Sequence, residues 1–148
     1  MRMARINDQE GSKFDAPLEV VWKYLRSPEA HGTAHKNSRN RAMKPLTDSS
    51  FVVSWEQNMN GNWVRAASRV TFFPPLGLVT EVIEGPMTGS KMMIVYTPHG
   101  PKTEVSIYAE MQSAAVPGPQ LEPMVRGAWE VAFNEDSVGV REFAKNSK

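Results

Sequence analysis

Asp136 is the residue whose position most clearly suggests chemistry. It falls between Ala132 and Phe143 on the apolar face of a predicted C-terminal helix, where a carboxylate is unusual. Burial without a cation disfavours the ionised form, so we expect the pKa of Asp136 to lie above its ordinary value. Two interpretations are open: Asp136 contacts a ligand or transfers a proton, or it reaches water or a backbone amide where the apolar face meets solvent.

Four other side chains are predicted to face the same interior. Tyr96 lies on an apolar strand face, where its hydroxyl either orients a ligand carbonyl or phenol, or is satisfied by a neighbour within the core. Gln57 and Ser68 are candidates for the few polar groups that fix a ligand in an apolar pocket. Trp55 either lines a cavity or packs within the hydrophobic core. Ser68 lacks a recognisable nucleophile turn and an assigned base, so no catalytic residue is identified.

Two histidines, His31 and His35, are four residues apart. This spacing aligns two imidazoles on a helix, but Gly32 argues that the helix does not continue between them. No acidic residue follows at a spacing typical of metal ligands. The sequence therefore predicts no metal site, and it places His35 in a loop at a pocket entrance.

Composition excludes several classes of protein. The chain has 148 residues, 41% of them hydrophobic, with a formal charge of +1 and no cysteine. This balance gives no general attraction to nucleic acid, and the basic run Lys36 to Arg41 is typical of a solvated face. No disulfide or thiolate metal site is possible. Met1 to Lys13 does not resemble a secretory signal, and no apolar stretch is long enough to span a bilayer, so we expect a cytoplasmic protein.

The elements that must position these residues can be predicted from patterns. Asp15 and Pro17 begin a short amphipathic helix, and Pro28 to Gly32 favours a second one. Residues 37 to 114 alternate like an antiparallel meander. After residue 119 the period becomes helical for 20 residues or more, although Gly127 and Gly139 suggest either a close approach to the sheet or room left for something else.

Turn residues fix the register of two hairpins. Asn60-Gly61 is a strong hairpin signal, and it places Glu56 opposite Arg65 on the outer face. A second turn at His99 and Gly100 places Tyr96 on the inner face. The inward residues of 78 to 84 are not fixed by the pattern. The predicted inner face of the first hairpin consists of Phe51, Val53, Trp55, Gln57, Val64, Ala66, Ser68, Val70 and Phe72.

The opening phrase Phe14-Asp15-Ala16-Pro17, then Val21-Trp22 and Ser27-Pro28-Glu29, resembles that of the START-like helix-grip superfamily, also called SRPBCC. The order of the predicted elements agrees with this resemblance. It implies an α+β helix-grip fold, in which a curved antiparallel sheet of about seven strands wraps around a long C-terminal helix, with two short helices after strand one. It also implies that residues 1–148 form a single START-like ligand-binding domain.

In that superfamily a cavity between sheet and helix holds an apolar molecule. The resemblance therefore implies a small hydrophobic or aromatic ligand, of lipid, polyketide or quinone type, with no cofactor. We expect a cavity of roughly 300 Å³ or more, lined by Trp55, Tyr96 and the stretch Val125 to Asp136. The predicted ligand-binding residues are Trp55, Gln57, Ser68, Tyr96, Asp136 and His35.

Two alternatives come from other classes of protein. A polyketide aromatase/cyclase-like enzyme would need Asp136, Tyr96 and Ser68 to converge. A protein-interaction or chaperone-cofactor domain would have a filled interior and an exposed apolar patch. The expected partner is a small hydrophobic molecule, without nucleic acid or stable membrane insertion, and the oligomeric state stays open with a homodimer among the options.

Overall fold

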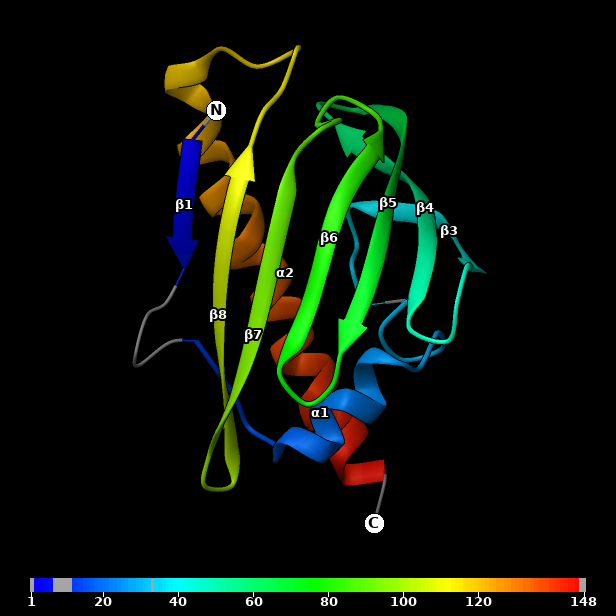
Figure 1. Cartoon of the computed structure of the whole chain (residues 1–148), viewed down its shortest axis with the longest axis vertical. Helices are drawn as coiled ribbons and strands as arrows, with labels where there is room; N and C mark the ends of the chain where they lie inside the picture. Colours follow the sequence, from blue (N-terminus) through cyan, green and yellow to red (C-terminus); the bar gives the residue numbers. More distant parts are fainter. Residues whose placement is uncertain (1, 7–11, 33, 147–148) are drawn as a thin grey trace.

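A computed structural model of the chain describes residues 2–6, 12–32 and 34–146 (Figure 1). These residues form an antiparallel sheet and two helices. The elements in chain order are β1 (Arg2–Ile6), β2 (Lys13–Phe14), α1 (Leu18–Leu25), β3 (Ser38–Pro45), β4 (Ser50–Met59), β5 (Asn62–Phe73), β6 (Gly77–Glu84), β7 (Lys91–His99), β8 (Lys102–Met111) and α2 (Gly118–Asn146).

Strands β3 to β8 form a meander, and the N-terminal strands β1 and β2 pair with its last strand. The strand order of the sheet is β1-β8-β7-β6-β5-β4-β3, and β2 pairs with another part of β8. Figure 1 shows this sheet curving across α2, with α1 near the C-terminal end of α2. The predicted α+β helix-grip architecture is therefore confirmed. Among the described residues, no helix combines the length and apolar character needed to cross a membrane.

The β4–β5 hairpin has the predicted register. Glu56 lies opposite Arg65, and Val53 lies opposite Ser68. Asn60 has a positive φ of 55° and Gly61 one of 88°, as the tight turn requires. Glu56 and Arg65 each form an ion pair with the strand on their other side. Glu56 binds Arg39 of β3 at 3.2 Å, and the guanidinium of Arg65 binds a carboxylate of β6.

The β7–β8 hairpin turns one residue later than predicted. His99 pairs with Lys102, so Gly100 (φ 61°) and Pro101 form the turn. Tyr96 is buried and so faces inward as expected, and the shifted register places it opposite Val105. In β6, whose inward side the sequence left open, Leu78 is buried while the apolar residues Val79 and Ile83 are exposed. Apolar side chains on both faces explain why alternation could not decide the inward side.

Only one of the two predicted short helices forms. After α1 the chain makes turns over residues 28–32. The amide of His31 donates to the Ser27 carbonyl at 2.9 Å, which closes a single helical turn. A Cβ at Gly32 would collide with the Pro28 carbonyl, so the backbone folds back tightly there. The second helix was therefore only partly predicted correctly, because Gly32 ends it before it can extend.

Helix α2 packs one side against the sheet and α1, burying Leu121, Val125 and Val140. Gly139 lies against Tyr24, where an added Cβ would be 2.5 Å from the tyrosine hydroxyl. Gly139 therefore permits a close approach, but the neighbour is α1 and not the sheet that the sequence led us to expect. A Cβ on Gly127 would meet no atom within 4 Å, so close approach does not account for that glycine.

Trp22 joins α1 to the sheet. Its ring is 7% exposed and makes edge contacts with Phe72 and Tyr96, with centroids 5.5 Å and 5.6 Å away. The indole Nε1 donates a hydrogen bond to the Pro75 carbonyl at 3.2 Å. Trp22 therefore fixes the helix that carries Tyr24 against the β5–β6 turn.

Strand β3 lies at one end of the sheet. Its pairing with β4 shifts register between Arg39 and Ala42, and Asn40 has a positive φ of 54°. Residues 39–45 of the strand are all exposed, and it ends at Pro45. The strand is therefore bulged and exposed.

Candidate functional site

A cavity of about 240 Å³ lies between the sheet and α2. It is smaller than the volume predicted from the sequence. Apolar walls come from the sheet and from Trp129, Ala132 and Phe133 of α2. Arg41 and Met43 are exposed and also line it, so the cavity meets solvent beside β3.

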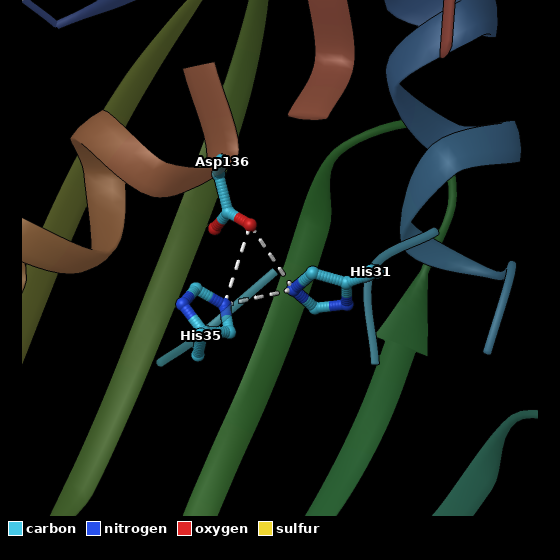
Figure 2. A group of neighbouring side chains, drawn as sticks. All are labelled: His31, His35 and Asp136. Atoms are coloured by element: carbon cyan, nitrogen blue, oxygen red, sulfur yellow. Dashed lines mark hydrogen bonds and ion pairs between the residues drawn. The ribbon is translucent and has the colours of Figure 1, made fainter. Parts of the chain in front are cut away.

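Polar side chains gather at one wall of this cavity. His31 and His35 come from the segment after α1, and Asp136 comes from α2, as Figure 2 shows. The two Nε2 atoms are 3.4 Å apart. Oδ1 of Asp136 lies 3.5 Å from Nε2 of His31 and 3.3 Å from Nε2 of His35. Each side chain is about one fifth exposed or less, so the three groups meet in a largely desolvated place.

Hydrogen bonds from neighbouring groups hold each of the three side chains. Nδ1 of His35 donates to Oε1 of Glu135 at 3.2 Å, since a carboxylate only accepts. The Tyr24 hydroxyl donates to Oδ1 of Asp136 at 2.9 Å. The His31 ring is hydrogen-bonded to the Leu25 backbone. The rotamers are therefore fixed from outside the cluster.

The two histidines have opposite pKa shifts. Burial lowers the pKa of His31 to about 4, although the charge of Asp136 opposes this effect. Burial also acts against a charge on His35, but hydrogen bonds to Asp136 and Glu135 outweigh it and raise its pKa. His31 is therefore neutral at pH 7, while His35 holds its proton more tightly than a free histidine.

The predicted pKa of Asp136 is wrong in direction. Burial raises it, but the hydrogen bond to His35, the charges of both histidines and the hydrogen bond from Tyr24 bring it below its ordinary value. The sequence argument assumed burial without a cation, and the fold places two imidazoles beside the carboxylate. Burial and the same carboxylate raise the pKa of Tyr24.

The structure brings some of the predicted site residues together and leaves others apart. Asp136, Tyr96 and His35 line the cavity. Among the described residues that line it, Trp55, Gln57 and Ser68 do not appear. The cavity meets β4 at Phe51 and Val53, before the inward positions Trp55 and Gln57. Ser68 is buried at 6% exposure within the sheet.

Sequence reasoning missed four contributors to this wall: His31, Tyr24, Glu135 and Arg41. The four-residue spacing of the histidines was the available signal. The helix does not continue through Gly32, as expected, but the conclusion that the two imidazoles are therefore not aligned is wrong, because the turns over residues 28–32 bring both rings together. Asp136 then supplies the acidic neighbour from more than 100 residues away.

Comparisons with known proteins identify the fold. No family model matches the chain, and no curated protein matches it. Several solved structures do, at 12–16% identity. A protein of Thermus thermophilus matches with a TM-score of 0.76 and 16% identity, covering 99% of both chains.

Two further solved structures carry descriptive names. The Zhui aromatase/cyclase of Streptomyces sp. R1128 matches with a TM-score of 0.76 and 12% identity, covering 99% of this chain and 96% of its own. A START superfamily protein of Mycobacterium smegmatis matches with a TM-score of 0.78 and 14% identity, covering 95% of this chain and 97% of its own. The chain therefore has the START-like helix-grip fold.

Proposed function

We propose that the cavity binds a small hydrophobic or aromatic molecule with one polar end, and that the chain acts as a single ligand-binding domain. The observation that carries the proposal is the asymmetry of the cavity wall. Apolar side chains of the sheet and of α2 enclose most of it, and polar groups gather at the wall formed by His35 and Asp136. An apolar pocket with a few convergent polar groups is the usual form of a small-molecule site.

The volume limits the ligand. Drug-sized ligands occupy pockets of about 300–1,000 Å³, whereas an apolar cavity of about 150 Å³ is enough for benzene. A cavity of about 240 Å³ therefore favours a one- or two-ring molecule. A hydroxyl on its polar end would donate to Asp136, and a carbonyl would accept from protonated His35 or from Arg41.

Filling the cavity tests this proposal. Ala132 of α2 lines the cavity, while Ala128, one turn earlier, is exposed and is not part of the lining. We expect Ala132→Phe to weaken binding of 2-naphthol at least about tenfold, because the added ring takes the place of the ligand. Ala128→Phe should leave the affinity unchanged. Titration calorimetry with 2-naphthol measures both.

Native mass spectrometry of freshly purified protein, followed by denaturation, would identify any molecule that purifies with the chain. A 2-naphthol affinity that is the same in Ala132→Phe and in the unaltered protein would show that binding occurs elsewhere. That result would contradict a ligand site in the cavity.

An enzyme resembling the aromatase/cyclases is a second candidate. A partly buried His35–Asp136 pair beside an apolar cavity favours it, because such a pair can move a proton to or from a bound molecule. Of the three groups expected to converge, Asp136 and Tyr96 line the cavity and Ser68 does not. An interaction domain with a filled interior is less well supported, since the interior holds this cavity.

A further inference from the structure

We propose that His31, His35 and Asp136 bind a divalent transition-metal ion at the cavity wall, in a four-coordinate site of the kind that holds Zn²⁺. The two imidazole nitrogens and one carboxylate oxygen all lie within 4.8 Å of one another. A donor set of two nitrogens and one oxygen suits zinc and its first-row neighbours, whereas magnesium and calcium prefer oxygen donors alone.

The distances between the donor atoms fit a tetrahedral ion. Zinc lies about 2.0–2.1 Å from histidine nitrogen and carboxylate oxygen, so two ligands of a tetrahedral ion are about 3.3–3.4 Å apart. The three separations measured here are 3.3, 3.4 and 3.5 Å. Adjacent ligands of an octahedral ion at the same bond length would be only about 2.8–3.0 Å apart. The triangle therefore has the size of one face of a tetrahedron around zinc.

The chemistry of the three atoms also calls for a cation between them. The Nδ1 atom of His35 donates to Glu135, and the ring of His31 donates to the Leu25 backbone. The two Nε2 atoms and Oδ1 of Asp136 face one another across the triangle that Figure 2 shows. A single proton can bridge one edge of this triangle, and charge-assisted hydrogen bonds are about 2.7–2.9 Å long. Three nearly equal edges above that length are better explained by a metal ion that binds all three atoms.

Outer groups orient the ligands as they do in known metal sites. Metal-binding histidines commonly donate their second ring N–H to a carboxylate or a backbone carbonyl, which sets the tautomer. His35 does so to Glu135, whose other oxygen accepts from the Lys36 amide at 3.0 Å. Tyr24 fixes the rotation of the Asp136 carboxylate. The supporting shell is thus present around each ligand.

The position of the three groups gives the ion access to the cavity. All three line it, so the fourth coordination position would open toward the cavity and accept water or a ligand oxygen. Binding of the ion does not depend on the hydrophobic ligand proposed above. Both proposals are therefore testable separately, since zinc binding is measured without any organic molecule.

Calorimetry with ZnCl₂ tests the proposal, using the full chain without a histidine tag after treatment with a chelator. We expect one Zn²⁺ per chain. His31→Ala and His35→Ala should each weaken binding by roughly a hundredfold or more, and Glu135→Gln by about 10–100-fold, the usual effect of losing an outer-shell partner. His99→Ala is the matched control, because His99 is the third histidine of the chain and lies exposed at the β7–β8 turn. The zinc affinity of the His99→Ala variant should equal that of the unaltered protein.

Cobalt gives a second measurement that needs no variant. Co²⁺ in a four-coordinate site absorbs visible light strongly, while six-coordinate Co²⁺ absorbs weakly. We expect the strong spectrum from the unaltered protein and its loss on adding Zn²⁺. Circular dichroism checks that each variant folds. If an alanine variant does not fold, the cobalt spectrum of the unaltered protein and the zinc affinity of Glu135→Gln test the metal site. Absence of one-to-one binding, a weak six-coordinate spectrum, or equal zinc affinity in folded His35→Ala would overturn the metal site.

Discussion

Trp22→Ala should lower the free energy of unfolding by about 3–5 kcal/mol, the range for removing a buried aromatic side chain. The ring is 7% exposed and contacts both Phe72 and Tyr96, so its loss leaves a cavity between α1 and the sheet. The Pro75 carbonyl also loses its hydrogen bond from the indole. Urea unfolding followed by far-ultraviolet circular dichroism measures the change, and the melting temperature should fall by roughly 6–20 °C.

Trp63→Ala is the matched control for this substitution. Trp63 of β5 is 37% exposed, and its ring faces the Arg39 guanidinium at 4.0 Å. Such exposed contacts contribute about 0.5–1 kcal/mol, so this variant should stay within about 1 kcal/mol of the unaltered protein. Equal decreases in the free energy of unfolding of the two variants would contradict the assignment of Trp22 as the residue that joins α1 to the sheet.

Two glycines of α2 should respond in opposite directions to alanine. At Gly139 the new Cβ would lie 2.5 Å from the Tyr24 hydroxyl, and relieving such overpacking costs about 1–3 kcal/mol. At Gly127 no atom lies within 4 Å of a Cβ, so alanine should stabilise the helix by about 1 kcal/mol through its higher helix propensity. Because the gain in helix propensity is the same at both positions, the two variants should differ by the overpacking cost of about 1–3 kcal/mol.

The same unfolding measurement in urea compares the glycine variants. Gly139→Ala should also disturb Asp136, because a displaced Tyr24 can no longer donate to its carboxylate at 2.9 Å. Stabilisation by Gly139→Ala would show that the packing of α1 against α2 is looser than the structure indicates. Gly127→Ala cannot be destabilising unless that face of α2 is covered by something else.

Local chemistry made the sheet predictable. The Asn60-Gly61 turn has only a few conformations, so the register of β4 and β5 follows from it residue by residue. The alternation in β7 likewise placed Tyr96 inward. The pattern could not decide β6, since Val79 and Ile83 are apolar and exposed. The pattern also predicted a second short helix after Pro28, where the structure has only turns. There the backbone contact at Gly32 outweighs helix propensity.

The candidate site was predictable only in part, because its partners are distant in sequence. Asp136 was identifiable as a carboxylate on an apolar helix face, and it does line the cavity. The direction of its pKa shift depends on His31 and His35, which approach it only through the packing of α2 against the segment after α1. A single sequence contains no signal for that approach. The inward positions Trp55, Gln57 and Ser68 were assigned from strand periodicity, which gives the face of a sheet but not how far along it a cavity extends.

The bulged edge strand β3 has a consequence for how copies of this chain meet. An exposed strand edge is a template for pairing with another chain, and natural sheets avoid this with bulges, lysines and prolines at the edge. β3 has all three: the register shift near Asn40, Lys44, and Pro45, which has no amide hydrogen to donate. We therefore expect that two copies do not extend one continuous sheet through β3, and that the chain resists fibril-like aggregation from this side.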